Sequence, residues 1–314
     1  MIYPRPLPRG GLIGICSPAG PVKRDRLEQA VSGLKTAGFR VKLSPSAYGR
    51  EGCLSAQDSV RAQELEDLFR DPEVDAVFSS RGGTGTSRLL SRLDLSAIAG
   101  CAKPFLGFSD ITALQWALWA RHEYVSFTGP LAVEWDGSVS AAARDLALSV
   151  LTQEFAGDLL AGLESTSQRS VEVLRGRGEI RGVLMPGNLA IITTLLGTRW
   201  MPDLRGTILF IEDISEAPYR FDRMLFHLKN AGALDGLAGL LVGDFGWTGE
   251  DGEYESQRQS IRDATADSDY PIVVGLPYGH GKERLTLPIG VPVRVTLSER
   301  PGLHLEPLSG EASS

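Results

Sequence analysis

The N-terminal part of the sequence, up to Phe127, alternates short apolar segments with longer segments whose apolar residues recur at helical spacing. This alternation is typical of βαβ units, in which a helix follows each strand and crosses back over the sheet. The pattern therefore predicts an α/β fold with a mostly parallel sheet that is covered by helices on both faces. The expected strands are 11–16, 39–43, 74–79, 104–108 and 124–127, and the expected helices are 24–37, 56–70, 87–93 and 110–120.

The segment 151–170 separates this regular pattern from a less regular second half. It shows no clear periodicity and ends in polar residues, which is typical of a linker. Beyond it, short apolar segments dominate, and helices are expected at 188–197 and from about 219 to 230. We therefore expect an N-terminal domain (1–150), a linker (151–170) and a smaller C-terminal α/β domain (171–314).

Composition limits the classes of partner. The net charge of −7 argues against a general nucleic-acid binder, because binding to phosphates needs a basic face. No apolar run reaches the roughly 18 residues of a membrane span, and the N-terminal MIYPRPLPRGG lacks the apolar region of a signal peptide. The three widely spaced cysteines fit a reducing compartment, so we expect a cytoplasmic protein.

Three loops follow expected parallel strands, namely SPAGP (17–21), SRGGTG (80–85) and GFSD (107–110). Open parallel sheets bind ligands at the carboxyl ends of their strands. Ser109 stands between a strand and a helix, which is where a strand–turn–helix elbow exposes a nucleophilic hydroxyl. Ile111 occupies the place of the second glycine in the GxSxG pattern. An alternative interpretation is that Ser109 and Asp110 only cap the next helix.

The sequence RGGTG (81–85) has two adjacent glycines after an expected strand. Such a turn lets backbone N–H groups converge on an anion, either a bound phosphate or the oxyanion of a reaction intermediate. A plain tight turn is the alternative. Both the GxGxxG spacing and the P-loop lysine are missing from this stretch, so nucleotide binding is weakly supported.

Among the four histidines, His280 is the candidate general base. It stands in GLPYGHG after an apolar strand, and glycines on both sides free the imidazole to reach across a cleft. A histidine base needs an acceptor that orients it, and Glu212, at the end of TILFIE, is the best candidate. Asp213 and Glu216 are alternatives, and the competing interpretation is an ordinary loop histidine with a solvated acidic turn. No HExxH motif or spaced cysteine–histidine cluster indicates a metal site.

Six stretches of the sequence occur together in an order and spacing that are specific. They are GLIGICSPAGP, SSRGGTGTSRLL, KPFLGFSDITAL, FTGPL, MPGNLAIITTLLGTRWMPDLRGTILFIEDISEAPYRFDRML and GLPYGHG. In these stretches the chain resembles the LD-carboxypeptidase family of serine peptidases, which includes muramoyl-tetrapeptide carboxypeptidases and the microcin C immunity proteins. The resemblance extends over almost the whole chain.

The resemblance implies a flavodoxin-like, class I amidotransferase-like N-terminal domain, a smaller C-terminal α/β domain and a homodimer. It also implies a catalytic triad in which Ser109 is the nucleophile, Glu212 the acid and His280 the base. The backbone N–H groups of Gly83 and Asp110 would form the oxyanion hole. No metal or cofactor is implied.

The implied reaction is the release of the C-terminal D-Ala from murein tetrapeptide during peptidoglycan recycling. Arg81 abuts the glycine turn and is a candidate for binding the free carboxylate of the substrate. Thr84 stands where the family usually has a tyrosine that lines the substrate mouth, which leaves the specificity open. Gln115 stands where the family usually has histidine, on the helix after the nucleophile, and we do not expect it to alter the triad.

Two alternative functions accompany this interpretation. One is the hydrolysis of microcin-type aminoacyl-nucleotides, an immunity role whose family branch is expected to be longer and to carry an extra aromatic-bearing loop. Trp247 is the residue that favours this alternative. The other is a non-catalytic flavodoxin-like protein that binds an anion, in which Ser109 would only cap a helix.

Overall fold

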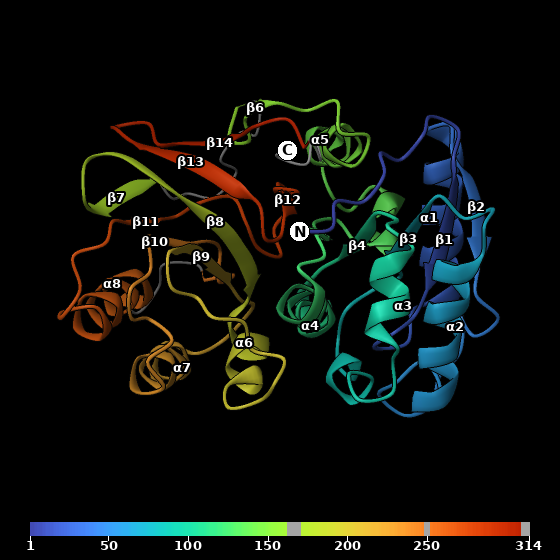
Figure 1. Ribbon diagram of the computed structural model, residues 1–314, viewed down its shortest axis with the longest axis horizontal. Helices are drawn as coiled ribbons and strands as arrows, with labels where there is room; N and C mark the ends of the chain where they lie inside the picture. Colours follow the sequence, from blue (N-terminus) through green and yellow to red (C-terminus); the bar gives the residue numbers. More distant parts are fainter. Residues whose placement is uncertain (162–170, 248–251, 309–314) are drawn as a thin grey trace. The chain divides into compact units, whose positions relative to one another are not determined.

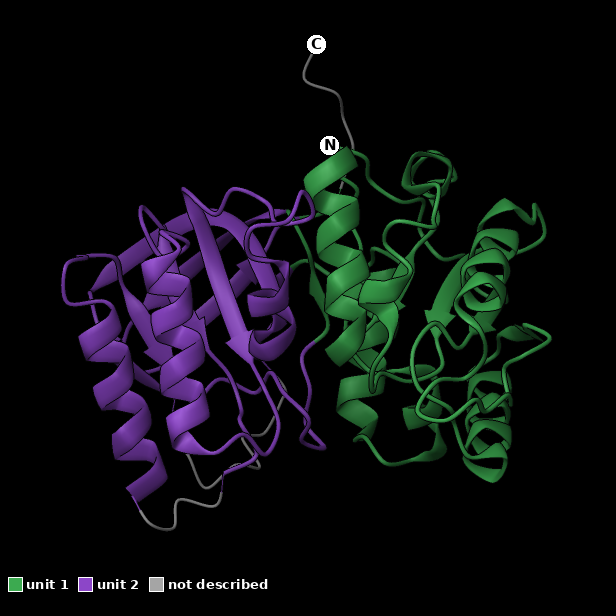
Figure 2. Ribbon diagram, turned by 90° about the horizontal axis from the view of Figure 1, so that it is seen from below, with its two compact units in different colours: residues 1–156, 286–290, 307–314 green, residues 157–285, 291–306 purple. Residues whose placement is uncertain are grey.

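The computed structural model describes residues 1–161, 171–247 and 252–308, which form two compact units (Figure 2). The first unit contains Met1–Ala156, Thr286–Gly290 and, at the end of the described chain, Pro307 and Leu308. The second contains the described residues of 157–285 and 291–306. This division differs in detail from the expected domains, because the chain returns to the first unit at Thr286. Within the expected linker (151–170), residues 162–170 lie outside the described residues.

The first unit contains a six-stranded sheet with the strand order β12-β5-β4-β3-β1-β2 (Figure 1). The strands are β1 (Leu12–Cys16), β2 (Arg40–Leu43), β3 (Ala76–Ser79), β4 (Phe105–Gly107), β5 (Phe127–Thr128) and β12 (Leu287–Pro288). The first five pair in parallel, and β12 pairs with β5 in antiparallel orientation. The order 2-1-3-4-5 is that of flavodoxin-like sheets, so the predicted fold class is confirmed.

Several helical segments of the first unit pack in two groups. The helices are α1 (Arg24–Thr36), α2 (Asp58–Arg70), α3 (Leu95–Gly100), α4 (Thr112–His122) and α5 (Ala141–Leu151), with 3-10 segments at Thr86–Arg88, Ser109–Ile111 and Ala132–Asp136. In one group α2, α3 and α4 pack side by side, and in the other α1 packs against the 3-10 segment Ala132–Asp136. The helix expected at 87–93 is wrong, because the buried Leu89, Leu90 and Leu93 are accommodated by successive tight turns.

The second unit contains an eight-stranded sheet with the order β6-β14-β13-β8-β9-β10-β11-β7 (Figure 1). Its strands are β6 (Gly157–Asp158), β7 (Glu172–Arg175), β8 (Gly178–Asn188), β9 (Thr207–Glu212), β10 (Gly239–Val242), β11 (Ile272–Val274), β13 (Pro292–Leu297) and β14 (Gly302–Leu305). The four central strands, β8 to β11, are parallel to one another, and the flanking strands pair in antiparallel orientation. The unit is therefore mixed α/β, as expected, with a parallel centre.

The helices α6 (Leu189–Leu195), α7 (Pro218–Asn230) and α8 (Glu253–Ala264) lie along one face of this sheet (Figure 1). The sequence did not lead us to expect α8, because it is mostly polar and two of its four buried residues, Gln257 and Ser260, are polar as well. Ile261 and Ala264 are the apolar members of its buried face, so the apolar stripe consists of few residues. In the described parts of the chain, no helix combines the length and the apolar character needed to cross a membrane.

Candidate active site

The three loops singled out in the first unit lie at the same edge of its sheet. They follow β1, β3 and β4, which are neighbouring parallel strands. The strand order reverses between β1 and β3, and open α/β sheets bind ligands at such a switch point. The loops 17–21, 80–85 and 107–110 therefore occupy the position expected of a ligand-binding edge.

Ser109 has a strained backbone conformation. Its φ of 61° lies in the left-handed region, which residues other than glycine seldom adopt. Such strain is common at catalytic residues, and a nucleophile on a sharp turn between a strand and a helix is an example. The 3-10 segment Ser109–Ile111 begins after Phe108, and α4 begins after Ile111. Ser109 and Asp110 therefore do not occupy cap positions, and the helix-cap interpretation is wrong.

The glycine turn after β3 abuts Ser109 within the first unit. A Cβ atom at Gly82 would lie 2.9 Å from the Cβ of Ser109 and 3.2 Å from its Oγ, so only glycine allows this approach. The carbonyl of Gly82 accepts a hydrogen bond from the Gly20 N–H at 3.1 Å, which ties the turn to the loop after β1. The structure thus brings the turn that carries Gly83 next to the proposed nucleophile.

The other predicted residues of this unit have defined surroundings. Arg81 Nη1 donates to the carbonyl of Pro21 at 3.0 Å, and Thr84 is exposed. Gln115 is fully buried, and its Nε2 donates to the carbonyl of Phe127 at 2.6 Å, which joins α4 to β5. Gln115 therefore holds core elements together, while substrate contacts by Arg81 and Thr84 stay predictions.

Glu212 and His280 meet in the second unit. Glu212 is the last residue of β9 and is fully buried. Its Oε2 lies 2.9 Å from Nδ1 of His280, whose side chain is 20% exposed. A carboxylate accepts a hydrogen bond from Nδ1–H, and in that tautomer the basic lone pair is on Nε2. The side chains selected as acid and base thus form a hydrogen-bonded pair, although 68 positions separate them in the sequence.

Asn188 is a residue of this site that sequence reasoning missed. It is the last residue of β8 and pairs in register with Glu212. Its Nδ2 donates to Oε1 of Glu212 at 3.2 Å and to Oδ1 of Asp213 at 3.0 Å, so one amide bridges two adjacent carboxylates. Its Oδ1 accepts from the Ile191 N–H and caps α6. A polar residue at the junction of a strand and a helix is the signal that could have identified it.

Asp213, an alternative acid in the sequence analysis, supports this bridge. Its Oδ1 also accepts from the backbone N–H of Ile214, and its Oδ2 accepts from that of Ala190, both at 2.9 Å. Burial, and then the neighbouring charge of Glu212, raise the pKa of Asp213 to about 6. Asp213 therefore anchors Asn188 and α6, while Glu212 is the carboxylate that contacts His280.

The loop after β9 is held by an aromatic cluster that includes Trp247. The indole packs against Phe221 and Phe245, with ring centroids 5.7 and 5.3 Å away, and only 8% of Trp247 is exposed. Its Nε1 donates to the carbonyl of Glu216 at 2.5 Å, and the Glu216 carboxylate pairs with Arg220. Trp247 thus packs inside the unit, and the half-buried Glu216 pairs with the exposed Arg220.

The first unit carries a strained serine beside a glycine turn, and the second carries a hydrogen-bonded Glu–His pair. These are the groups with which serine hydrolases perform acyl transfer. In the described ranges, no group of three or more histidine, cysteine, aspartate or glutamate side chains could hold a metal ion. Fold and site residues therefore indicate the class of serine hydrolases.

Comparison with known families agrees with this class. Residues 13–129 match the N-terminal domain of LD-carboxypeptidases, and residues 181–295 match their C-terminal domain. The chain belongs to the LD-carboxypeptidase family of serine peptidases, as the sequence resemblance indicated.

Individual relatives cover nearly the whole chain. The "Probable murein peptide carboxypeptidase" of Bacillus subtilis is 34% identical over 306 residues, which are 95% of this chain and 92% of that protein. The crystal structure of muramoyltetrapeptide carboxypeptidase from Oxalobacter formigenes is similar with a TM-score of 0.78 and 30% identity, covering 93% of this chain and 97% of that one. The microcin C7 self immunity protein MccF, in complex with aspartyl sulfamoyl adenosine, gives a TM-score of 0.86 and 26% identity, covering 98% and 99%.

Proposed function

We propose that the chain is an LD-carboxypeptidase that releases the C-terminal D-Ala from murein tetrapeptide in peptidoglycan recycling. The observation that carries the proposal is the hydrogen bond between the buried Glu212 and His280. The left-handed backbone of Ser109 and the relatives named as murein carboxypeptidases support it. We assign Ser109 as nucleophile, His280 as base and Glu212 as the acid that orients His280.

In the proposed mechanism, His280 Nε2 takes the hydroxyl proton as Ser109 Oγ attacks the carbonyl carbon before the terminal D-Ala. Glu212 holds the Nδ1–H tautomer and stabilises the imidazolium that forms. When the tetrahedral intermediate collapses, the peptide C–N bond breaks, and His280 returns the proton to the leaving D-Ala nitrogen. Water then hydrolyses the acyl-enzyme by the same proton transfers, which releases the tripeptide.

The proposed oxyanion hole consists of the backbone N–H groups of Gly83 and Asp110. The contact between the glycine turn and Ser109 supports this assignment, since it brings both peptide segments to the nucleophile. Loss of one such donor typically costs about 10²–10³ in rate. We assign Arg81 to the free carboxylate of the substrate, because its guanidinium stands beside the same turn.

The direct test is incubation with murein tetrapeptide, followed by mass spectrometry. The wild-type protein should release D-Ala and leave the tripeptide, and the Ser109→Ala variant should not. Absence of D-Ala release by the folded wild type would refute the substrate, and full activity of Ser109→Ala would refute the nucleophile.

A second candidate function is the hydrolysis of aminoacyl-nucleotides, which the similarity to MccF favours. The burial of Trp247 weighs against it, because a packed indole offers no aromatic face for a nucleobase. Competition between murein tetrapeptide and an aspartyl-adenylate analogue distinguishes the two. We expect the tetrapeptide to be cleaved with the higher kcat/KM.

The homodimer implied by the resemblance and the cytoplasmic location expected from the cysteine usage are part of the same proposal. Light scattering on the purified protein should give twice the mass of the 33.8 kDa chain. Fractionation of cells that produce the tagged protein should find it in the cytoplasm. A monomeric mass would refute the homodimer, and recovery outside the cytoplasm would refute the cytoplasmic location.

A further inference from the structure

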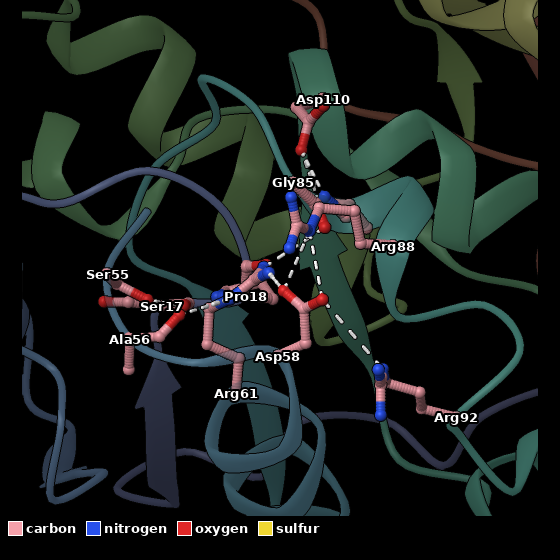
Figure 3. Close-up of polar contacts among 11 residues, drawn as sticks. Ser17, Pro18, Ser55, Ala56, Asp58, Arg61, Gly85, Arg88, Arg92 and Asp110 are labelled. Carbon is pink, nitrogen blue, oxygen red and sulfur yellow. Dashed lines mark hydrogen bonds and ion pairs between the residues drawn. The ribbon is translucent and has the colours of Figure 1, made fainter. Parts of the chain in front are cut away.

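Arg61 on α2 is a buried arginine whose guanidinium is bound to several loops of the first unit (Figure 3). Its side chain is fully buried. Nη1 donates to the carbonyl of Pro18 and, at 3.2 Å, to that of Gly85. Nε donates to the carbonyl of Ala56 at 3.0 Å, and Nη2 pairs with Asp58 Oδ1 at 2.5 Å. One side chain therefore links the segments that follow β1 and β3 with the start of α2.

The chemistry of this contact requires arginine. A buried charge is costly unless it is paired and hydrogen-bonded, and here Asp58 supplies the charge while three carbonyls accept the N–H groups. The planar guanidinium offers five donors in fixed directions, whereas a lysine ammonium is a point charge with three. Lysine would keep the charge but could not reach the same carbonyls in the same geometry.

A single peptide group is held at both ends. The carbonyl of Gly85 accepts from Arg61 (Figure 3). The N–H of the same peptide, on Thr86, donates to Oδ2 of Asp110 at 2.8 Å. The hydroxyl of Thr86 donates to the same oxygen at 2.5 Å. A cation thus faces the negative end of the peptide dipole and an anion faces the positive end, which strengthens both hydrogen bonds. Since Asp110 follows Ser109, the contact fixes the glycine turn to the nucleophile elbow.

We propose that Arg61 is a positioning residue of the catalytic site. Together with the Asp110 carboxylate it clamps the Gly85–Thr86 peptide and so holds the Gly82–Gly83 turn at the distance from Ser109 that the oxyanion hole needs. The inference rests on the proposed function, because the position of this turn matters for rate only if Ser109 is the nucleophile. Arg61 acts through the backbone carbonyls to which it donates.

Two exposed arginines provide the contrast. Arg88 and Arg92 approach the same Asp58, with closest N–O distances of 2.9 and 4.0 Å, and their side chains are 61% and 53% exposed. The guanidinium of Arg88 bonds both oxygens of Asp58 at the surface of the unit. A change at Arg88 therefore perturbs the same carboxylate while leaving the carbonyls of Pro18 and Gly85 in place, which makes it the matched control.

The experiment compares the Arg61→Lys variant with Arg88→Lys and the wild type. We expect Arg61→Lys to lower kcat for D-Ala release about 10²-fold with KM within about twofold, because a misplacement of about 1 Å costs this much. Arg88→Lys should stay within about twofold of the wild type, as surface substitutions usually do. Hydrogen exchange should become faster in the amides of 82–86 in Arg61→Lys, while β1, β3 and β4 keep their protection.

Wild-type kcat in a folded Arg61→Lys variant overturns the proposal, and so does an equal loss in Arg88→Lys. Loss of protection throughout the first unit also overturns it, because Arg61 would then only stabilise the fold. If Arg61→Lys does not fold, Asp58→Asn takes its place. This variant removes the charge that orients the guanidinium, so the donor to the Gly85 carbonyl is no longer held in place. Unchanged kcat and unchanged exchange in it overturn the proposal.

Failure of the proposed function is recognised separately. If the wild type releases no D-Ala, the substrate assignment falls, whereas the exchange measurement and the rate of labelling of Ser109 by a fluorophosphonate still test Arg61. We expect Arg61→Lys to be labelled more slowly than Arg88→Lys. Equal labelling rates together with equal exchange would overturn the role of Arg61 whatever the substrate is.

Discussion

The first unit presents its candidate catalytic group through backbone conformation, whereas the second unit builds its part from side chains at the ends of parallel strands. Ser109 depends on a left-handed φ and on a glycine turn that touches it. Glu212 and His280 depend on hydrogen bonds that extend through Asn188 to Asp213. The two units should therefore lose activity through different kinds of substitution. The first should be sensitive to a side chain added at a glycine, and the second to the removal of a charge or a hydrogen-bond donor.

The largest effect is expected in the second unit, for Glu212→Gln. The amide keeps the shape of the side chain but disfavours the Nδ1–H tautomer of His280, so kcat should fall about 10³–10⁴-fold. The measurement is D-Ala release by a folded variant. The control is Glu216→Gln, which removes a half-buried carboxylate paired with the exposed Arg220 and should change kcat less than about twofold. A larger loss in Glu216→Gln than in Glu212→Gln would contradict the assignment of the acid.

In the first unit, the sharpest test of the backbone argument is Gly82→Ala. The added methyl group would lie 2.9 Å from the Cβ of Ser109, so either the turn or the serine must shift. We expect kcat to fall about 10²–10³-fold, as for the loss of an oxyanion donor. Gly100→Ala in α3 is the control, since its Cβ meets nothing within 4 Å, and it should leave kcat unchanged. Equal kcat values for the two variants would contradict the claim that the first unit depends on the close approach of the glycine turn to Ser109.

The charge of Asp213 should appear in the pH dependence of stability. Its pKa is raised from 3.8 to about 6 in the folded protein. The folded state thus binds the proton more tightly, so the stabilisation is complete below pH 3.8 and is lost as the pH rises through 6. It amounts to at most about 3 kcal/mol. Denaturant unfolding between pH 4 and 8 should show the wild type gaining stability relative to Asp213→Asn as the pH falls, and a difference independent of pH would refute this.

The smallest effect is expected for Asn188→Ala. This change removes the donor shared by Glu212 and Asp213, and we expect kcat to fall about tenfold, since a hydrogen bond to a charged group is worth about 1.5–3 kcal/mol. It also removes the cap of α6, which costs about 1 kcal/mol of stability. Ser140→Ala removes a comparable cap from α5 and separates the two effects. If both variants lose the same activity, Asn188 acts only as a cap.

Much of the fold was accessible from the sequence because its signals are local. The strand-like GLIGIC and TILFIE became β1 and β9, and the helix expected at 24–37 became α1. Local signals failed in two segments. In α8, polar side chains are buried, and after Thr86, buried leucines occur in tight turns rather than in a helix. In those segments tertiary packing decided the outcome over periodicity.

For the site, the sequence by itself determined the loops that follow strands, the elbow around Ser109 and the acidic and histidine-bearing segments of the second half. It left Glu212, Asp213 and Glu216 as alternatives, and neither Arg61 nor Asn188 was selected from it as a site residue. Only the tertiary structure decided these points, because strand order and register bring together groups that lie far apart in the chain. The pairing of Asn188 with Glu212 follows from the β8–β9 register, and the bond from Arg61 to Gly85 follows from the packing of α2 beside β1 and β3.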